Sequence, residues 1–217
     1  MRRRQERLDE TRQRIAEAAF ELHATVGPAQ TSISAVAERA GVQRHTVYNH
    51  FPDMTSLIRA CTEHGMAVTR PPLAAPWAAI EDPTLRLRTG LAELYPYYRA
   101  NARLLGNVTR DLPLVGTGGS EAFLERMGEL FSALAAGWPG DAGIHRLRMA
   151  AIGHAMAFET WRSLTQPGLS DAEAADLMVG LVANVDGGLG ATASAGQVGV
   201  AALGRRPGGV KPRGPRR

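Results

Sequence analysis

The sequence of 217 residues contains one cysteine, Cys61, and one lysine, and only 6% of its residues are aromatic. A single cysteine excludes a disulfide bond within the chain and any zinc site built from several cysteines of one chain. No run of about 18 apolar residues is present, so no membrane-spanning helix is expected. The basic N-terminal segment is not followed by an apolar one, unlike a secretory signal. We therefore expect a cytoplasmic protein that does not enter a membrane, and no pattern requires a metal or a cofactor.

Hydrophobic residues make up 44% of the sequence and charged residues 21%, which is typical of a folded protein. The net charge of +4 is unevenly distributed, because residues 1–14 contain six arginines and residues 205–217 contain six basic residues and no acidic one. We expect a basic N-terminal arm at 1–14, which either follows a DNA groove or is a frayed helix start. Residues 191–217 are rich in glycine, proline and arginine, which predicts a disordered basic tail. Such a tail could add DNA attraction that is independent of sequence.

Residues 32–51 have the spacing of two short helices joined by a tight turn. Ser32 is a residue type that caps helix N-termini, and Gly41 can adopt a positive φ without steric cost. In the second helix Val47 and Phe51 lie four residues apart and should point inward, and Pro52 ends the helix. Its outer face carries arginine, histidine, threonine, tyrosine and asparagine side chains. This combination suits a recognition helix in the major groove of DNA.

The stretch ERAGVQRHTVYNHFPD resembles the signature of the TetR family of transcriptional regulators, whose pattern runs approximately IAxxAGVSxxTLYxHFxxKxxL. The resemblance covers about residues 11–65. It implies an all-α protein, with an N-terminal three-helix helix-turn-helix domain at 15–60 and a helical ligand-binding and dimerisation domain at 61–190. Two positions depart from the pattern: Gln43 stands at the usual serine N-cap and Met54 at a common phosphate-binding lysine. The matching residues are Ala40, Gly41, Val42, Thr46, Tyr48, His50, Phe51 and Leu57.

The resemblance also implies which side chains contact double-stranded DNA. Three residues match variable base-reading positions: Arg44, His45 and Asn49. Three others match positions that usually bind the phosphate backbone: Thr46, Tyr48 and His50. Ser34, on the preceding helix, completes the expected contacts. A two-fold dimer would present two recognition helices about one turn of DNA apart, so the expected operator is palindromic.

The sequence after residue 61 predicts about five helices, of which the last two, at about 142–165 and 171–186, carry apolar stripes. The residues alone allow either the core of a monomer or a subunit interface. The resemblance implies an interface, because members of the family pair their last two helices into a four-helix bundle across a two-fold axis. The expected homodimer contacts are Ala151, Ala155, Phe158, Leu177, Leu181 and Val185.

Aromatic and methionine side chains are concentrated in the middle of the same region. Each of them alone could belong to the core, but together they suggest a cavity for a small, mostly apolar effector, which the resemblance also implies. We expect His154 to be its polar anchor. The candidate ligand contacts are Trp77, Tyr98, Phe123, Met127, His154 and Phe158.

These patterns predict a sequence-specific DNA-binding regulator, a repressor that a small effector releases from its operator, and not an enzyme. The GTGGS segment at 116–120 lacks the GK[ST] of a phosphate-binding loop. His45 and His50 lie five residues apart, on different faces of a helix, and do not form a metal site. Two alternatives remain open. One is a helical small-molecule-binding protein that does not read DNA sequence, and the other is an all-α enzyme acting on an apolar substrate in the same cavity.

Overall fold

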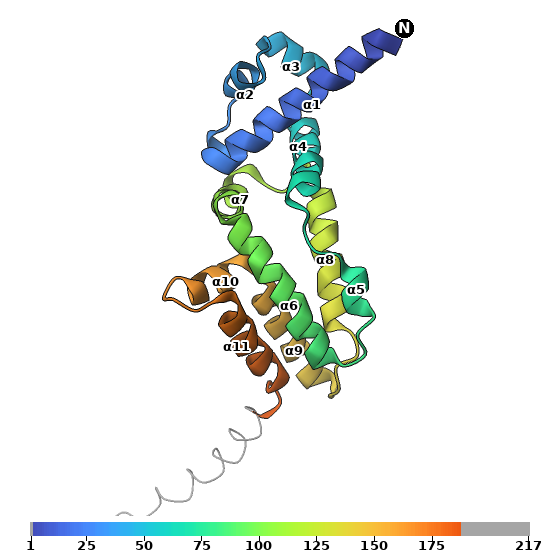
Figure 1. Ribbon diagram of the computed structural model, residues 1–217, viewed down its shortest axis with the longest axis vertical. Coiled ribbons are helices and arrows are strands. Elements are labelled where there is room, and N and C mark those ends of the chain that lie inside the picture. The colour runs from blue at the N-terminus through green and yellow to red at the C-terminus, as the bar shows by residue number, and fades with distance from the viewer. Residues whose placement is uncertain (1, 188–217) are drawn as a thin grey trace, which may run out of the picture.

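The computed structural model describes residues 2–187, and all secondary structure in this range is helical. The predicted all-α fold with an N-terminal helix-turn-helix is confirmed. Figure 1 shows α1, α2 and α3 at one end of an elongated molecule and a bundle of helices at the other, with α4 reaching from one to the other. No helix within residues 2–187 is long and apolar enough to cross a lipid bilayer. The predicted tail at 191–217 lies outside the described residues.

The N-terminal part consists of α1 (Arg2–Thr25), a short 3-10 helix η1 (Pro28–Gln30), α2 (Ile33–Ala40), α3 (Arg44–His50) and the start of α4 (Met54–Thr69). Its core joins the apolar faces of these helices, and Ile15, Val36 and Val47 are fully buried in it. The apolar residues recur three or four positions apart in each helix, so each helix places one face in this core.

Residues 2–14 of the expected arm form the largely exposed first half of α1. Pairs of side chains four residues apart stabilise these turns: Arg2 Nε lies 3.0 Å from Glu6 Oε1, and Gln5 donates to Asp9 over 3.1 Å. In Figure 1 this segment extends beyond α3.

The second part contains seven further helices. Its core surrounds α6, where Leu87, Leu91, Leu94 and Tyr95 are fully buried. Side-chain caps set several of the helix starts, including Ser170, which forms a capping box at the last helix. The helices are α5 (Ala74–Ala78), α6 (Pro83–Ala100), α7 (Ala102–Val115), α8 (Glu121–Ala135), α9 (Ala142–Met156), α10 (Phe158–Thr165) and α11 (Asp171–Ala183).

The single long helix predicted at about 142–165 is wrong, because the structure has two helices separated at Ala157, whose ψ is 132°. Two hydroxyl groups from α6 explain the break. Tyr95 donates to the carbonyl oxygen of Ala155 over 2.8 Å, and Tyr98 donates to that of Met156. These tyrosines bind carbonyl groups at the end of α9 that would otherwise accept hydrogen bonds from the next turn.

Candidate DNA interface and effector cavity

The turn between α2 and α3 has the geometry that the sequence predicts. Ser32 Oγ accepts a hydrogen bond from the Ala35 amide over 3.1 Å, and Gly41 is left-handed, with φ 65° and ψ 38°. The amide of Val42 then donates to the Ala37 carbonyl over 2.9 Å, which closes the end of α2. Val47 and Phe51 are buried, with 0% and 2% exposure, so they fix α3 against α1 and α2.

The opposite face of α3 is available to a partner. Arg44, His45, Tyr48 and Asn49 are exposed, Thr46 and His50 are half-buried, and Ser34 is exposed on α2. Among residues 2–187, none of these side chains hydrogen-bonds or pairs with another group of the chain. Donors and acceptors of both base-reading and phosphate-binding type therefore remain free on one surface.

Arg12 is a positioning residue that the sequence motif does not reveal. Its Nη1 donates to the His50 carbonyl oxygen over 2.8 Å, and its guanidinium lies 4.3 Å from the centroid of the Phe51 ring. A cation at the C-terminus of a helix complements the partial negative charge of the free carbonyl groups. α1 thereby fixes the end of α3, through residues 38 positions apart in the sequence.

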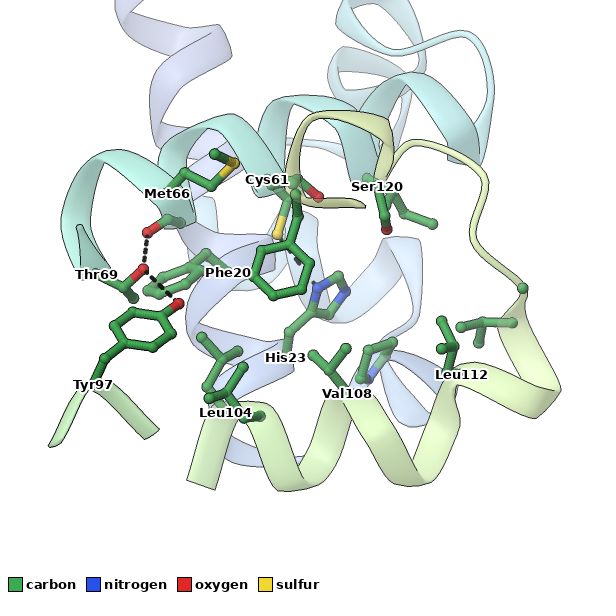
Figure 2. Close-up of a pocket in the computed structure, with 18 residues that line it drawn as sticks. Phe20, His23, Cys61, Met66, Thr69, Tyr97, Leu104, Val108, Leu112 and Ser120 are labelled. Carbon is green, nitrogen blue, oxygen red and sulfur yellow. Dashed lines mark hydrogen bonds between the residues drawn. The ribbon is translucent and has the colours of Figure 1, made fainter. Parts of the chain in front are cut away.

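A cavity of about 120 Å³ lies at the junction of the two parts of the molecule (Figure 2). Its walls come mainly from α1, α4 and α7, and Tyr97 of α6 and Phe123 of α8 also line it. Phe20, Met66, Leu104 and Val108 give it a mostly apolar lining. The helix-turn-helix end of the molecule thus supplies part of the wall.

The polar groups of the cavity are uncharged at neutral pH. His23 Nδ1 lies 3.3 Å from Cys61 Sγ, and burial lowers the pKa of His23 to about 4, an effect larger than the opposing influence of Asp111. Burial also raises the pKa of the Cys61 thiol to about 12. No aspartate, glutamate, lysine or arginine lines the cavity.

The face of α7 next to the cavity lining holds the C-terminus of α1. Arg103 donates to Thr25 O over 3.0 Å, and Asn107 Nδ2 donates to both His23 O and Ala24 O over 3.1 Å. Arg110 donates to Val26 O over 3.0 Å, and Asp111 accepts from the Ala29 amide over 3.0 Å. We call Arg103, Asn107, Arg110 and Asp111 the α7 clamp.

The clamp packs closely on the loop after α1. Gly27 has a φ of 100°, and a Cβ at this position would lie 2.3 Å from both Arg110 Nη2 and Asp111 Oδ2. Only glycine fits this backbone conformation and this approach without rearrangement. Several hydrogen bonds from α7 side chains to backbone carbonyl groups therefore join α7 to the C-terminal end of α1.

Residues 15–61 match the profile of a family described as bacterial regulatory proteins, tetR family. This match concerns the N-terminal part of the chain. No curated protein matches the sequence. Its whole fold nevertheless resembles a solved TetR-like transcriptional regulator from Rhodococcus sp. RHA1, with a TM-score of 0.58 and 20% identity, over 83% of this chain and 96% of that one.

Two further solved TetR-family regulators are similar. The protein from Streptomyces coelicolor has a TM-score of 0.55 and 19% identity over 86% of this chain and 83% of its own. The protein from Haloarcula marismortui ATCC 43049 has a TM-score of 0.53 and 17% identity over 82% of this chain and 96% of its own. At sequence identities this low, the similarity shows a shared fold and nothing more specific. The chain therefore shares the fold of these solved regulators, and its residues 15–61 match the N-terminal domain of the family.

Of the ligand contacts expected from the sequence, only Phe123 lines the cavity of this TetR-type fold. Trp77 is fully buried in the core and donates to Glu93 over 2.9 Å, and Tyr98 is buried with its hydroxyl on α9. Phe158 packs on Tyr98, with 5.6 Å between ring centroids. Met127 is half-buried against the same core, and His154 is exposed.

The sequence does not reveal the cavity residues of α1 and α4, which include Phe20, His23 and Met66. Their spacing is that of a helix packing into the core of its own domain. Only the packing of α7 beside them makes them walls of a cavity. Tyr97, rather than its neighbour Tyr98, faces the cavity because successive residues of a helix point in different directions.

The expected dimer contacts lie at different depths. Leu177 and Leu181 of α11 are 44% and 55% exposed, large values for leucine. Ala151, Phe158 and Val185 are half-buried. Ala155 is fully buried beneath the Tyr95 hydroxyl, so this residue is not available to a partner, and the expectation for it is wrong.

Proposed function

We propose that this protein is a homodimeric repressor that binds a palindromic operator in the cytoplasm and is released when a small, mostly apolar molecule occupies the cavity between α1, α4 and α7. The observation that carries the proposal is the outer face of α3. Its side chains are exposed and unpaired in the described part of the chain, while Val47, Phe51 and Arg12 fix the helix beneath them. A rigid helix with a free polar face can enter the major groove without reorganising.

The homodimer is supported by the exposed leucines of α11. Leu177 and Leu181 lie one helical turn apart, and Gly180 between them has open space beside it. Leu147 of α9, which packs against α11, is also 39% exposed. Apolar side chains next to a small residue allow two helices to approach closely, and a two-fold axis presents the same face twice.

Coupling between the cavity and DNA is supported by the two faces of α7. One face lines the cavity through Leu104, Val108 and Leu112, and the other carries the clamp that holds α1. α1 in turn holds the end of α3 through Arg12. A ligand that fits better when α7 has shifted would move α1 and favour an arrangement that does not match the operator.

A gel-shift experiment tests the proposal. The full-length protein is mixed with the intergenic DNA beside its own gene, in excess non-specific competitor. We expect a discrete complex that a scrambled duplex of the same length does not form. Equal binding of both duplexes would support instead a helical protein that does not read DNA sequence.

Arg44→Ala is expected to relax specificity at one base position in each half-site. Arg44 is exposed at the N-terminus of α3, where a guanidinium can reach guanine O6 and N7, a contact that discriminates by about 1–3 kcal/mol. Fluorescence anisotropy on a set of single-base operator variants measures this. A uniform loss of affinity on every variant would identify Arg44 as a phosphate contact.

Tyr48→Phe is expected to weaken operator binding by about 1–2 kcal/mol while leaving the fold intact. The Tyr48 side chain is 49% exposed, and its hydroxyl has no partner within residues 2–187, so the change removes only the bond to phosphate. Affinity is measured at low salt, with thermal unfolding as the control for folding. An unchanged affinity would show that this hydroxyl does not contact DNA.

A further inference from the structure

The size of the cavity between α1, α4 and α7 restricts what it can hold. Its volume of about 120 Å³ is close to that of an engineered apolar cavity of about 150 Å³ that takes up benzene. The walls are mostly aromatic, aliphatic and sulfur-containing side chains, among them Phe20, Phe123, Leu104 and Val108. The space therefore suits one six-membered ring.

The absence of charge on the lining restricts the ligand further. His23 and Cys61 are neutral, and the other lining polar groups are hydroxyls. A carboxylate or ammonium group placed here would lose its hydration without gaining an opposite charge, which is strongly unfavourable. Burial also raises the pKa of the Cys61 thiol, which disfavours the thiolate and makes this group a poor nucleophile.

One ring nitrogen of His23 supplies the polar contact. Its Nδ1 is occupied by the Cys61 thiol at 3.3 Å, and Figure 2 shows this pair among the lining side chains. Its Nε2 makes no hydrogen bond with any group in residues 2–187. Whichever tautomer is present, Nε2 offers either a proton or a lone pair. A hydroxyl group can serve both cases, because it both donates and accepts.

Two other hydroxyls of the cavity, those of Thr69 and Tyr97, are already hydrogen-bonded. Thr69 donates to the Gly65 carbonyl oxygen over 2.8 Å, and the Tyr97 hydroxyl lies 3.4 Å from Thr69 Oγ1 (Figure 2). Because the Thr69 proton is already used, Tyr97 is the donor in that pair. Within residues 2–187 His23 Nε2 makes no hydrogen bond, and neither do the hydroxyls of Thr62 and Ser120, which also line the cavity, so these three groups are free for a ligand.

We propose that the cavity binds an uncharged molecule of about one six-membered ring that carries a hydroxyl group, with the hydroxyl on His23 Nε2 and the ring between Phe20, Phe123 and Val108. This inference rests on the proposed function only in taking the occupant to be the effector.

Two matched pairs of probes test the ligand class on the full-length protein by calorimetry. Phenol and toluene have nearly the same size and differ in carrying a hydroxyl or a methyl group on the ring, and benzamide and benzoate have nearly the same shape but differ in charge. We expect phenol and benzamide to bind, and benzoate to bind at least tenfold more weakly than benzamide. Benzoate binding as tightly as benzamide, or no binding by either phenol or toluene, would overturn the proposal.

Two variants test the geometry. His23→Phe keeps a ring and removes its nitrogens, so the ratio of phenol to toluene affinity should fall by about threefold to tenfold, the value of one hydrogen bond. An unchanged ratio would overturn the role of His23. Val108→Phe fills the cavity and should abolish the binding of both probes, whereas retained binding would place them elsewhere.

A measurement on the unaltered protein keeps the test decisive if His23→Phe does not fold. With ¹⁵N-labelled histidine, the Nε2 resonance of His23 should shift on addition of phenol and not of toluene. Equal responses to both would contradict the proposed contact.

Operator binding is measured separately, so that the ligand class and the release mechanism can fail independently. If phenol binds as expected but leaves the operator affinity unchanged, the release mechanism alone is refuted. Specific operator binding with no probe bound would refute the ligand class alone.

Discussion

Replacing Leu181 by glutamate is expected to convert the protein into a helical monomer and to lower its operator affinity by orders of magnitude. Leu181 is 55% exposed in the single chain, so a glutamate there remains hydrated in the monomer and the fold survives. In the proposed dimer the charge would be buried without a partner, and the symmetry would present it twice. A monomer has one recognition helix and loses the second half-site.

Sedimentation velocity, circular dichroism and operator titration measure this effect together. Leu114→Glu is the matched control, because Leu114 is 77% exposed on α7, the helix that contacts α1 in Figure 1 rather than α9 or α11. This variant should remain a dimer. If Leu181→Glu remains a dimer of normal affinity, the interface is not on this face of α11.

Trp77→Ala is expected to lower the free energy of unfolding by about 3–5 kcal/mol. Trp77 is fully buried in the core near α6 and α8, and its indole nitrogen donates to Glu93 over 2.9 Å. The space left would lie beside Gly90, where an added Cβ would be 3.2 Å from the indole. Truncation therefore leaves a cavity, while the carboxylate of the exposed Glu93 stays hydrated. Urea unfolding at a fixed protein concentration measures the loss.

Trp138→Ala provides the comparison, because Trp138 is half-buried and its indole nitrogen donates to a backbone carbonyl of the same helical region, Leu134 O, over 2.8 Å. We expect a smaller loss of stability there. If Trp77→Ala had the same free energy of unfolding as the unaltered protein but no longer bound phenol, Trp77 would be the ligand contact that the sequence suggests.

The helix-turn-helix could be predicted in detail because its determinants are local. The cap at Ser32, the left-handed Gly41 and the buried pair Val47 and Phe51 each act within a few residues of their position. The chemistry of a cap or of a positive φ is visible in the residue type itself. The fold class followed from the same helical periodicity, continued along the chain.

The cavity and its connection to α1 could not be predicted because they depend on distant contacts. Asn107 reaches His23 across 84 positions, and Tyr95 interrupts the helix at Ala155 across 60. Tyr97 and Tyr98 are adjacent and chemically identical, yet one lines the cavity and the other belongs to the core. Periodicity shows that a helix has an apolar face, but not which neighbour covers it.

Selection of bound sequences from a pool of random duplex DNA tests the central claim most directly. The unaltered full-length protein is expected to enrich an inverted repeat whose half-sites are centred about one helical turn apart, and Arg44→Ala to lose enrichment at one base in each half-site. A pool that remains random after selection, although the protein retains it at low salt, would contradict sequence-specific reading by α3.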